Sequence, residues 1–238
     1  MRDDYTRIRV GGAWLAIASV LMIVVLMVHG PIAPELADQM VRVASRPVAW
    51  SLAHWLAAAA LSFYAVAGLV ILTSRSSLIR GGWSLSAWGV LLVGGLWTLN
   101  TAVVEATVVS AAAISGRTEV FEAWWAYAEG NANGFAVLAL ALAVIAASDA
   151  RGAPGATPPW AAWTATVAGV GSFTGWALGM WFGVGFGSLL WLASSILMSA
   201  WSAWFGTALV RSRASLIAGG PEPVREPSPA GVLGGIDY

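Results

Sequence analysis

The chain has 238 residues, of which 58% are hydrophobic and 10% are charged, and its formal net charge is zero. A soluble domain usually carries about 25% charged residues, so an ordinary soluble fold is excluded, and without a basic stripe there is no case for nucleic-acid binding. The absence of cysteine excludes disulfides and thiolate sites, and the absence of lysine excludes a retinal Schiff base.

Six apolar stretches are each long enough to cross a bilayer, for which about 18 apolar residues suffice. They cover residues 11–28, 48–73, 83–115, 121–148, 160–182 and 186–210. We therefore predict an all-α fold, a polytopic membrane helix bundle with six transmembrane helices. The first stretch has a signal peptide as its alternative, but its apolar core exceeds the usual length of about 7–15 residues, which favours a retained helix.

The connection between the first two stretches predicts a further, short helix. Pro34 suits the first turn of a helix, and Pro47 ends it. Leu36, Met40 and Val43 fall on one face, with charged residues elsewhere. This pattern is typical of an amphipathic helix lying on the outer membrane surface. A helix that covers the bundle is favoured over a gating lid.

The arginines predict the orientation of the bundle. With the N-terminus inside, the inner segments carry Arg2, Arg7, Arg9, Arg75, Arg80, Arg151, Arg211, Arg213 and Arg225, and the outer segments carry Arg42, Arg46 and Arg117. This excess follows the positive-inside rule. We expect a multi-pass protein of the bacterial cytoplasmic membrane, with both termini cytoplasmic and the lipid bilayer as its partner.

Composition divides the chain into four parts. Residues 1–148 form a four-helix membrane part with a polar cluster, 149–159 a Gly/Pro-rich inner linker, 160–213 a two-helix hairpin, and 214–238 a disordered cytoplasmic tail. The fifth helix has a glycine at every fourth position from Gly171 to Gly187, and the sixth has a row of small residues from Ser195 to Thr207. Such rows allow close helix approach, and we favour a hairpin over the alternative, a homodimer seam.

Two acids lie where lipid disfavours them. Glu105 precedes the outer end of the third helix, and Glu129 follows the outer start of the fourth, by about nine residues each, which places both about 14 Å below the boundary. Because antiparallel neighbours carry them, we expect the two carboxyls to meet as a buried Glu pair. An ionised acid is costly at that depth, so we expect them to share at least one proton near neutral pH.

Six further residues are candidates for contacting a ligand beside the two acids: His54, Trp97, Asn100, Thr101, Trp125 and Asn133. Trp97 and Thr101 share a helix face with Glu105 by i, i+4, i+8 spacing. Asn100, the residue before Thr101, lies beside this face. Asn133 shares a face with Glu129. The sequence thus predicts a polar pocket open to the outside within the first four helices.

Two functions stay open for this pocket. Paired acids inside a bundle are typical of proton relays, which indicates a proton-sensitive small-molecule binder or transporter. The alternative is a membrane-embedded enzyme on a lipid-soluble, isoprenoid-like substrate, because a protonated Glu is a general acid and Trp faces stabilise cations. Either would take a small lipophilic or cationic ligand. A structural accessory subunit is the background interpretation.

A metal site is a third interpretation. Glu105, Glu129 and His54 could surround one divalent ion, but no His-x-x-x-His or Glu-x-x-His spacing supports this. His29 and His54 flank a loop rather than facing each other across the bundle, which disfavours a bis-His haem. We therefore expect no metal and no cofactor.

The stretch from Val103 through Glu105 and Thr107 to Ser115, with the six-helix spacing, resembles an uncharacterised bacterial six-helix membrane family, a domain of unknown function. That family tends to place an Arg three residues before the Glu, where this chain has Ala102. The resemblance implies a bacterial inner-membrane protein and no particular chemistry.

Overall fold

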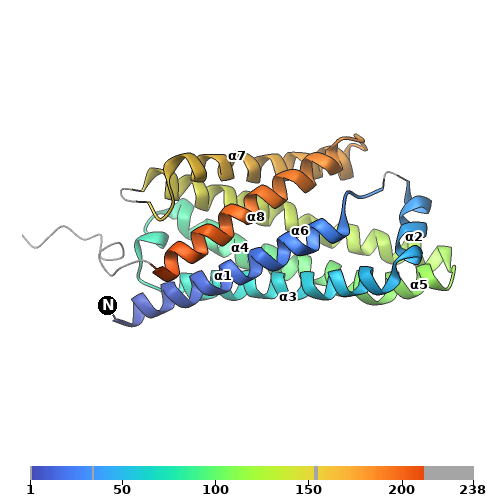
Figure 1. Ribbon diagram of the computed structural model, residues 1–238, viewed down its shortest axis with the longest axis horizontal. Coiled ribbons are helices and arrows are strands. Elements are labelled where there is room, and N and C mark those ends of the chain that lie inside the picture. The colour runs from blue at the N-terminus through green and yellow to red at the C-terminus, as the bar shows by residue number, and fades with distance from the viewer. Residues whose placement is uncertain (1, 34, 153–154, 212–238) are drawn as a thin grey trace, which may run out of the picture.

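The computed structural model describes residues 2–33, 35–152 and 155–211, so the predicted tail at 214–238 lies outside the described residues. Within these ranges the fold is all-α (Figure 1). The helices are α1 (Arg2–His29), α2 (Leu36–Ser45), α3 (Pro47–Leu72), α4 (Gly82–Val104), α5 (Ser110–Ile114), α6 (Thr118–Arg151), α7 (Pro159–Trp176) and α8 (Gly187–Arg211). The 3-10 turn η1 (Ser77–Ile79) and the π-helical segments η2 (Glu105–Val109) and η3 (Ala177–Trp181) complete the described structure.

Five helical segments in the described part of the chain are long and apolar enough to cross a membrane: α1, α3, the continuous run Gly82–Ile114, α6 and α8. The chain is therefore a multi-pass membrane protein. The sixth predicted stretch is also helical, as α7 and η3, and packs against α6 and α8. It is not among the five apolar segments.

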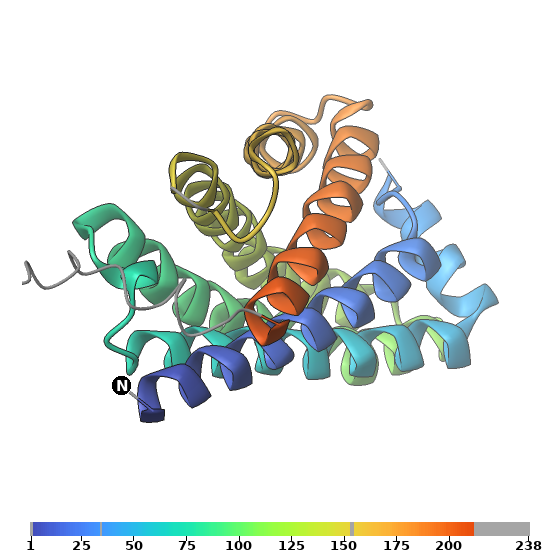
Figure 2. The ribbon, with the colours of Figure 1, turned by 60° about the vertical axis from the view of Figure 1, so that its left-hand side comes forward.

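The long helices form a closed ring. Each packs against the next along the chain, in the order α1, α3, α4, α6, α7 and α8, and α8 returns to pack against α1. Figures 1 and 2 show the N-terminus and the end of α8 at one end of the bundle, with α2 and α5 at the opposite end. We call this opposite end the α2 end.

One apolar core runs through this ring. Its buried residues come from all six helices, among them Leu15, Leu61, Leu91, Leu142, Ala162 and Phe205. The connection after α6 is fixed to the same body, because Asp149 accepts hydrogen bonds from the backbone N–H groups of Ala156 at 2.6 Å and Thr157 at 3.1 Å. The helices on both sides of that connection therefore share a single core.

Glycines set the closest helix contacts. In the hairpin of α7 and α8, a Cβ added to Gly175 would lie 2.9 Å from the Gly187 carbonyl oxygen. Helices α1 and α8, which close the ring, approach each other as closely, because a Cβ on Gly12 would lie 2.7 Å from the Gly206 carbonyl oxygen. Lipid provides no hydrophobic drive between helices, so such backbone contacts carry the packing energy.

Helix α2 lies across the end of the bundle, as its amphipathic pattern predicts. It buries Gln39 and Val43, and Val43 packs in a small cluster with Trp50, Phe121 and Trp125. The Arg42 side chain donates a hydrogen bond to the Pro31 carbonyl oxygen, which ties α2 to the segment that follows α1.

Replacing Gly12 by valine is expected to lower the free energy of unfolding by about 1–3 kcal/mol, the usual cost of overpacking, because the new side chain meets the backbone of α8. Thermal unfolding of the detergent-solubilised protein measures this. Gly89→Val is the matched control, because nothing lies within 4 Å of a Cβ at that position. Equal stability of the two variants would contradict the ring closure.

Candidate functional site

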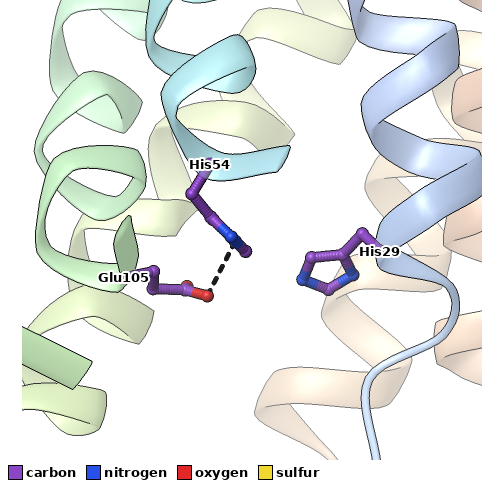
Figure 3. Close-up of side chains that lie close together, drawn as sticks. All are labelled: His29, His54 and Glu105. Atoms are coloured by element: carbon purple, nitrogen blue, oxygen red, sulfur yellow. Dashed lines mark ion pairs between the residues drawn. The ribbon is translucent and has the colours of Figure 1, made fainter. Parts of the chain in front are cut away.

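Three segments bring the two histidines of the chain and one membrane-embedded acid together near the α2 end. His29 is the last residue of α1, His54 lies in the second turn of α3, and Glu105 is the first residue of η2. Figure 3 shows the three side chains pointing toward one another from separate helices. We call them the His–Glu–His cluster.

The cluster is tight and largely buried. His54 Nε2 lies 2.9 Å from Glu105 Oε2, and the two side chains are 5% and 8% exposed. One ligand atom from each of the three residues lies within 4.8 Å of the others. The ring centroids of His29 and His54 are 5.3 Å apart at an interplanar angle of 64°. The two rings are therefore in edge-to-face contact, although the sequence places them on either side of a loop.

Backbone carbonyls determine which ring nitrogens are free. His54 Nδ1 lies 2.8 Å from the Trp50 carbonyl oxygen, and His29 Nδ1 lies 2.8 Å from the Gly30 carbonyl oxygen. Because a carbonyl oxygen can only accept, both Nδ1 atoms carry the proton, and each neutral ring keeps its lone pair on Nε2. Histidines that bind metals have this arrangement, with the other N–H fixed by a carbonyl or carboxylate.

The carboxylate of Glu105 remains incompletely satisfied. Its buried Oε2 lies against His54 Nε2, which carries no proton in the neutral ring, and has no other partner among the described residues. Two imidazole lone pairs and a carboxylate thus converge where neighbouring side chains exclude water. A buried carboxylate beside two imidazole lone pairs needs a compensating cation, either a proton or a metal ion.

A π-helical segment presents Glu105 to α3. In η2 the backbone makes a wider turn, and π segments occur frequently at functional sites. From α3, Ser51 Oγ donates a hydrogen bond of 2.8 Å to the Ala106 carbonyl oxygen, which satisfies a backbone group inside the wider turn. No sequence pattern distinguishes η2 from the regular helix before it.

The cluster borders a small pocket of about 90 Å³, which we call the His–Glu pocket. Its remaining wall is mostly apolar and includes Met22, Leu26, Leu61, Phe135, Trp176 and Trp191. The Trp50 ring packs against both histidines, with centroids 4.9 Å from His29 and 4.5 Å from His54. The site therefore combines three electron-pair donors with an aromatic, apolar space.

Glu129 is not part of this pocket. It is half-buried and lines a second cavity of about 290 Å³ at the α2 end, together with Trp125 and Gln39. No ion pair or hydrogen bond joins Glu129 to Glu105 in the described part of the chain. The expected Glu pair is thus replaced by a Glu105–His54 contact. The two acids line different cavities, Glu105 the His–Glu pocket and Glu129 the cavity at the α2 end.

The structure separates the residues predicted on the third helix. Thr101 is buried, lines the His–Glu pocket and donates a hydrogen bond of 2.7 Å to the Ala128 carbonyl oxygen. Trp97 is 40% exposed, and Asn100 is exposed and bonds to the backbone of its own helix. These two residues lie on the outer surface of the bundle and do not reach the pocket.

Asn133 joins two tryptophans rather than a ligand. Its Oδ1 accepts hydrogen bonds from Trp176 Nε1 and Trp181 Nε1, both at 2.9 Å. This holds η3 against α6 beside the His–Glu pocket. Trp125, the last of the predicted residues, is buried against Phe121 and reaches only the second cavity.

Comparison of the chain with models of protein families, with curated proteins and with solved structures finds no match in any of the three. The case for a function therefore depends on the geometry of the His–Glu–His cluster.

Proposed function

We propose that the protein is a membrane-embedded metalloprotein in which His29, His54 and Glu105 bind one divalent transition-metal ion. The observation that carries this proposal is the convergence of three ligand atoms within 4.8 Å. Two imidazoles and one carboxylate form the ligand set of a class of zinc enzymes and of mononuclear non-haem iron sites. Nitrogen donors disfavour Mg²⁺ and Ca²⁺.

The geometry requires a small adjustment to hold an ion. Ligand atoms about 2.1 Å from a tetrahedral ion lie about 3.4 Å from one another. His54 Nε2 and Glu105 Oε2 are at 2.9 Å, and the remaining separations, which involve His29, are within 4.8 Å. A movement of the His29 side chain by up to about 1.4 Å, with a slight opening of the Glu105–His54 contact, would bring the donors to the distances that a tetrahedral zinc site requires.

Charge balance supports the same assignment. An ionised carboxylate within the bilayer is costly, and a bound divalent cation compensates it while engaging both imidazole lone pairs. Three protein ligands leave at least one coordination position for a fourth group. That position adjoins the apolar wall of the His–Glu pocket, so the fitting ligand or substrate class is a small lipophilic molecule with one oxygen or nitrogen donor.

Two tryptophans support an oxygen ligand at this position. The indole N–H groups of Trp50 and Trp191 are buried and have no hydrogen-bond partner among the described residues, although a buried indole N–H usually has one. Both rings pack against His29. We infer that these N–H groups are the donors to an oxygen bound at the ion.

A proton-sensitive binder is the second candidate function. The observation that favours it is the 2.9 Å contact of His54 with Glu105, which a shared proton would stabilise without any metal. In this candidate the Glu105–His54 pair takes the role that the sequence interpretation assigned to two glutamates, and a small cationic or lipophilic ligand occupies the His–Glu pocket.

The distribution of arginines supports a location in a bacterial cytoplasmic membrane with both termini inside. The α2 end carries Arg42, Arg46 and Arg117, while the other described arginines are in α1, near η1 and at the ends of α6 and α8. Under the positive-inside rule the α2 end then faces outward. The proposed ion would be exchanged with the outer side.

The purified protein is expected to bind one Zn²⁺ per chain. Glu105→Gln and His54→Gln each remove a proposed ligand, so each is expected to weaken zinc binding by more than about 10- to 100-fold, the loss typical when a residue that only supports a metal ligand is replaced. Equilibrium titration of protein carrying a tag without histidine measures this. Glu122→Gln is the control, because Glu122 is exposed on α6. Unchanged zinc affinity in both site variants would contradict the metal site.

Infrared difference spectra distinguish the two candidate functions. Adding Zn²⁺ is expected to shift the carboxylate stretch of one glutamate, because metal coordination changes the carboxylate environment. The difference band should be absent in Glu105→Gln and retained in Glu129→Gln. A carboxyl band that responds to pH but not to Zn²⁺ would favour the proton-sensitive binder.

A further inference from the structure

The cavity at the α2 end, which contains Glu129, lies next to the His–Glu pocket along three segments. On α6, Glu129 lines the outer cavity at the α2 end, and Ala132, about one turn deeper, lines the His–Glu pocket. On α8, Ser188 lines the outer cavity and Trp191 lines the His–Glu pocket. Ile32, between α1 and α2, lines both. The two spaces are thus stacked along the bundle, with the His–Glu–His cluster at the inner one.

The outer of these two cavities is more polar than the inner one. Gln39 is 1% exposed and lines the outer cavity. Its Oε1 accepts a hydrogen bond of 3.0 Å from the Ala33 backbone N–H, which fixes the orientation of the amide. Its Nε2 has no partner among the described residues. Because buried N–H groups are nearly always paired, this cavity is suited to water or a hydrated ligand.

Glu129, when ionised, gives this cavity a negative charge. It is half-buried and has no ion-pair partner within the described ranges. A carboxylate in a confined cavity raises the local concentration of cations and their association rate. The neighbouring wall includes Gly183 and Gly185 of the turn between η3 and α8, and nothing lies within 4 Å of a Cβ added to either, so this wall leaves space for an ion with its water.

We propose that this outer cavity is the route by which the divalent ion reaches the His–Glu–His cluster, and that Glu129 binds the ion in transit. This inference rests on the proposed function. The ion enters with its water, exchanges water for the Glu129 carboxylate, and passes Ile32 to His29. His29 is the half-buried member of the cluster and therefore the first that an entering ion meets.

Rapid-mixing measurements with Co²⁺ test the route, because visible absorption reports Co²⁺ bound at a site of low symmetry. Glu129→Gln is expected to slow association about tenfold, at the lower end of electrostatic effects on association rates. Dissociation should slow by the same factor, because a transit site alters both directions equally. The equilibrium affinity and the absorption spectrum should therefore match those of the unmutated protein.

Glu122→Gln is the matched control. It removes the same charge from an exposed position on the same helix, and it should leave the association rate within about twofold of the unmutated protein. Equal slowing by both substitutions would indicate a general surface-charge effect and would overturn the transit role. So would a Glu129→Gln variant that binds Co²⁺ at the unmutated rate.

Ala33→Trp provides a test that keeps every charge. Ala33 lines the outer cavity but not the His–Glu pocket, so a larger side chain there should slow both association and dissociation without changing the spectrum. Unchanged rates would overturn the route. Failure of the unmutated protein to bind Co²⁺ at equilibrium would instead overturn the proposed function, and this inference with it.

Discussion

The structure depends on the burial of a carboxylate and two imidazoles among helices that cross a membrane. Glu105 and His54 are nearly inaccessible, and neither lipid nor apolar side chains can solvate the charge that such groups carry. Each Nδ1–H is already bonded to a backbone carbonyl, and one ligand atom from each of the three residues lies within 4.8 Å of the others. A cation among them, either a proton or a metal ion, resolves the electrostatic conflict, and the metal proposal answers this requirement.

The rest of the fold keeps these donors in place. Close glycine contacts join α8 to α1 and α7 to α8, which closes the ring of helices around the site. Ser51 supports the π-helical turn that directs Glu105 toward α3. Asn133 ties Trp176 and Trp181 to α6, and Trp176 forms part of the wall of the His–Glu pocket. A rigid ring of helices thus surrounds a small site near one end.

Sequence patterns predict the helical architecture well, because apolar runs and their lengths carry most of the information. They place Glu105 and Glu129 at a common depth, but depth along a helix does not fix the direction in which a side chain points. Trp97 and Thr101 show the same limit, since spacing put them on one face and only Thr101 reaches the pocket. The π segment at Glu105 changes the local rotation without any sequence signal.

The close contact between His29 and His54 could be predicted from the sequence. These are the only histidines in the chain, and they lie at the two ends of one connection between antiparallel helices, which gives them similar depth. The predicted loop between them suggested separation, whereas α2 lies across the end of the bundle and leaves α1 and α3 packed together.

X-ray absorption at the zinc edge of the loaded protein tests the central claim most directly. We predict two imidazole nitrogens and carboxylate oxygen at about 2.0–2.2 Å, and a shell of oxygen ligands alone would contradict it.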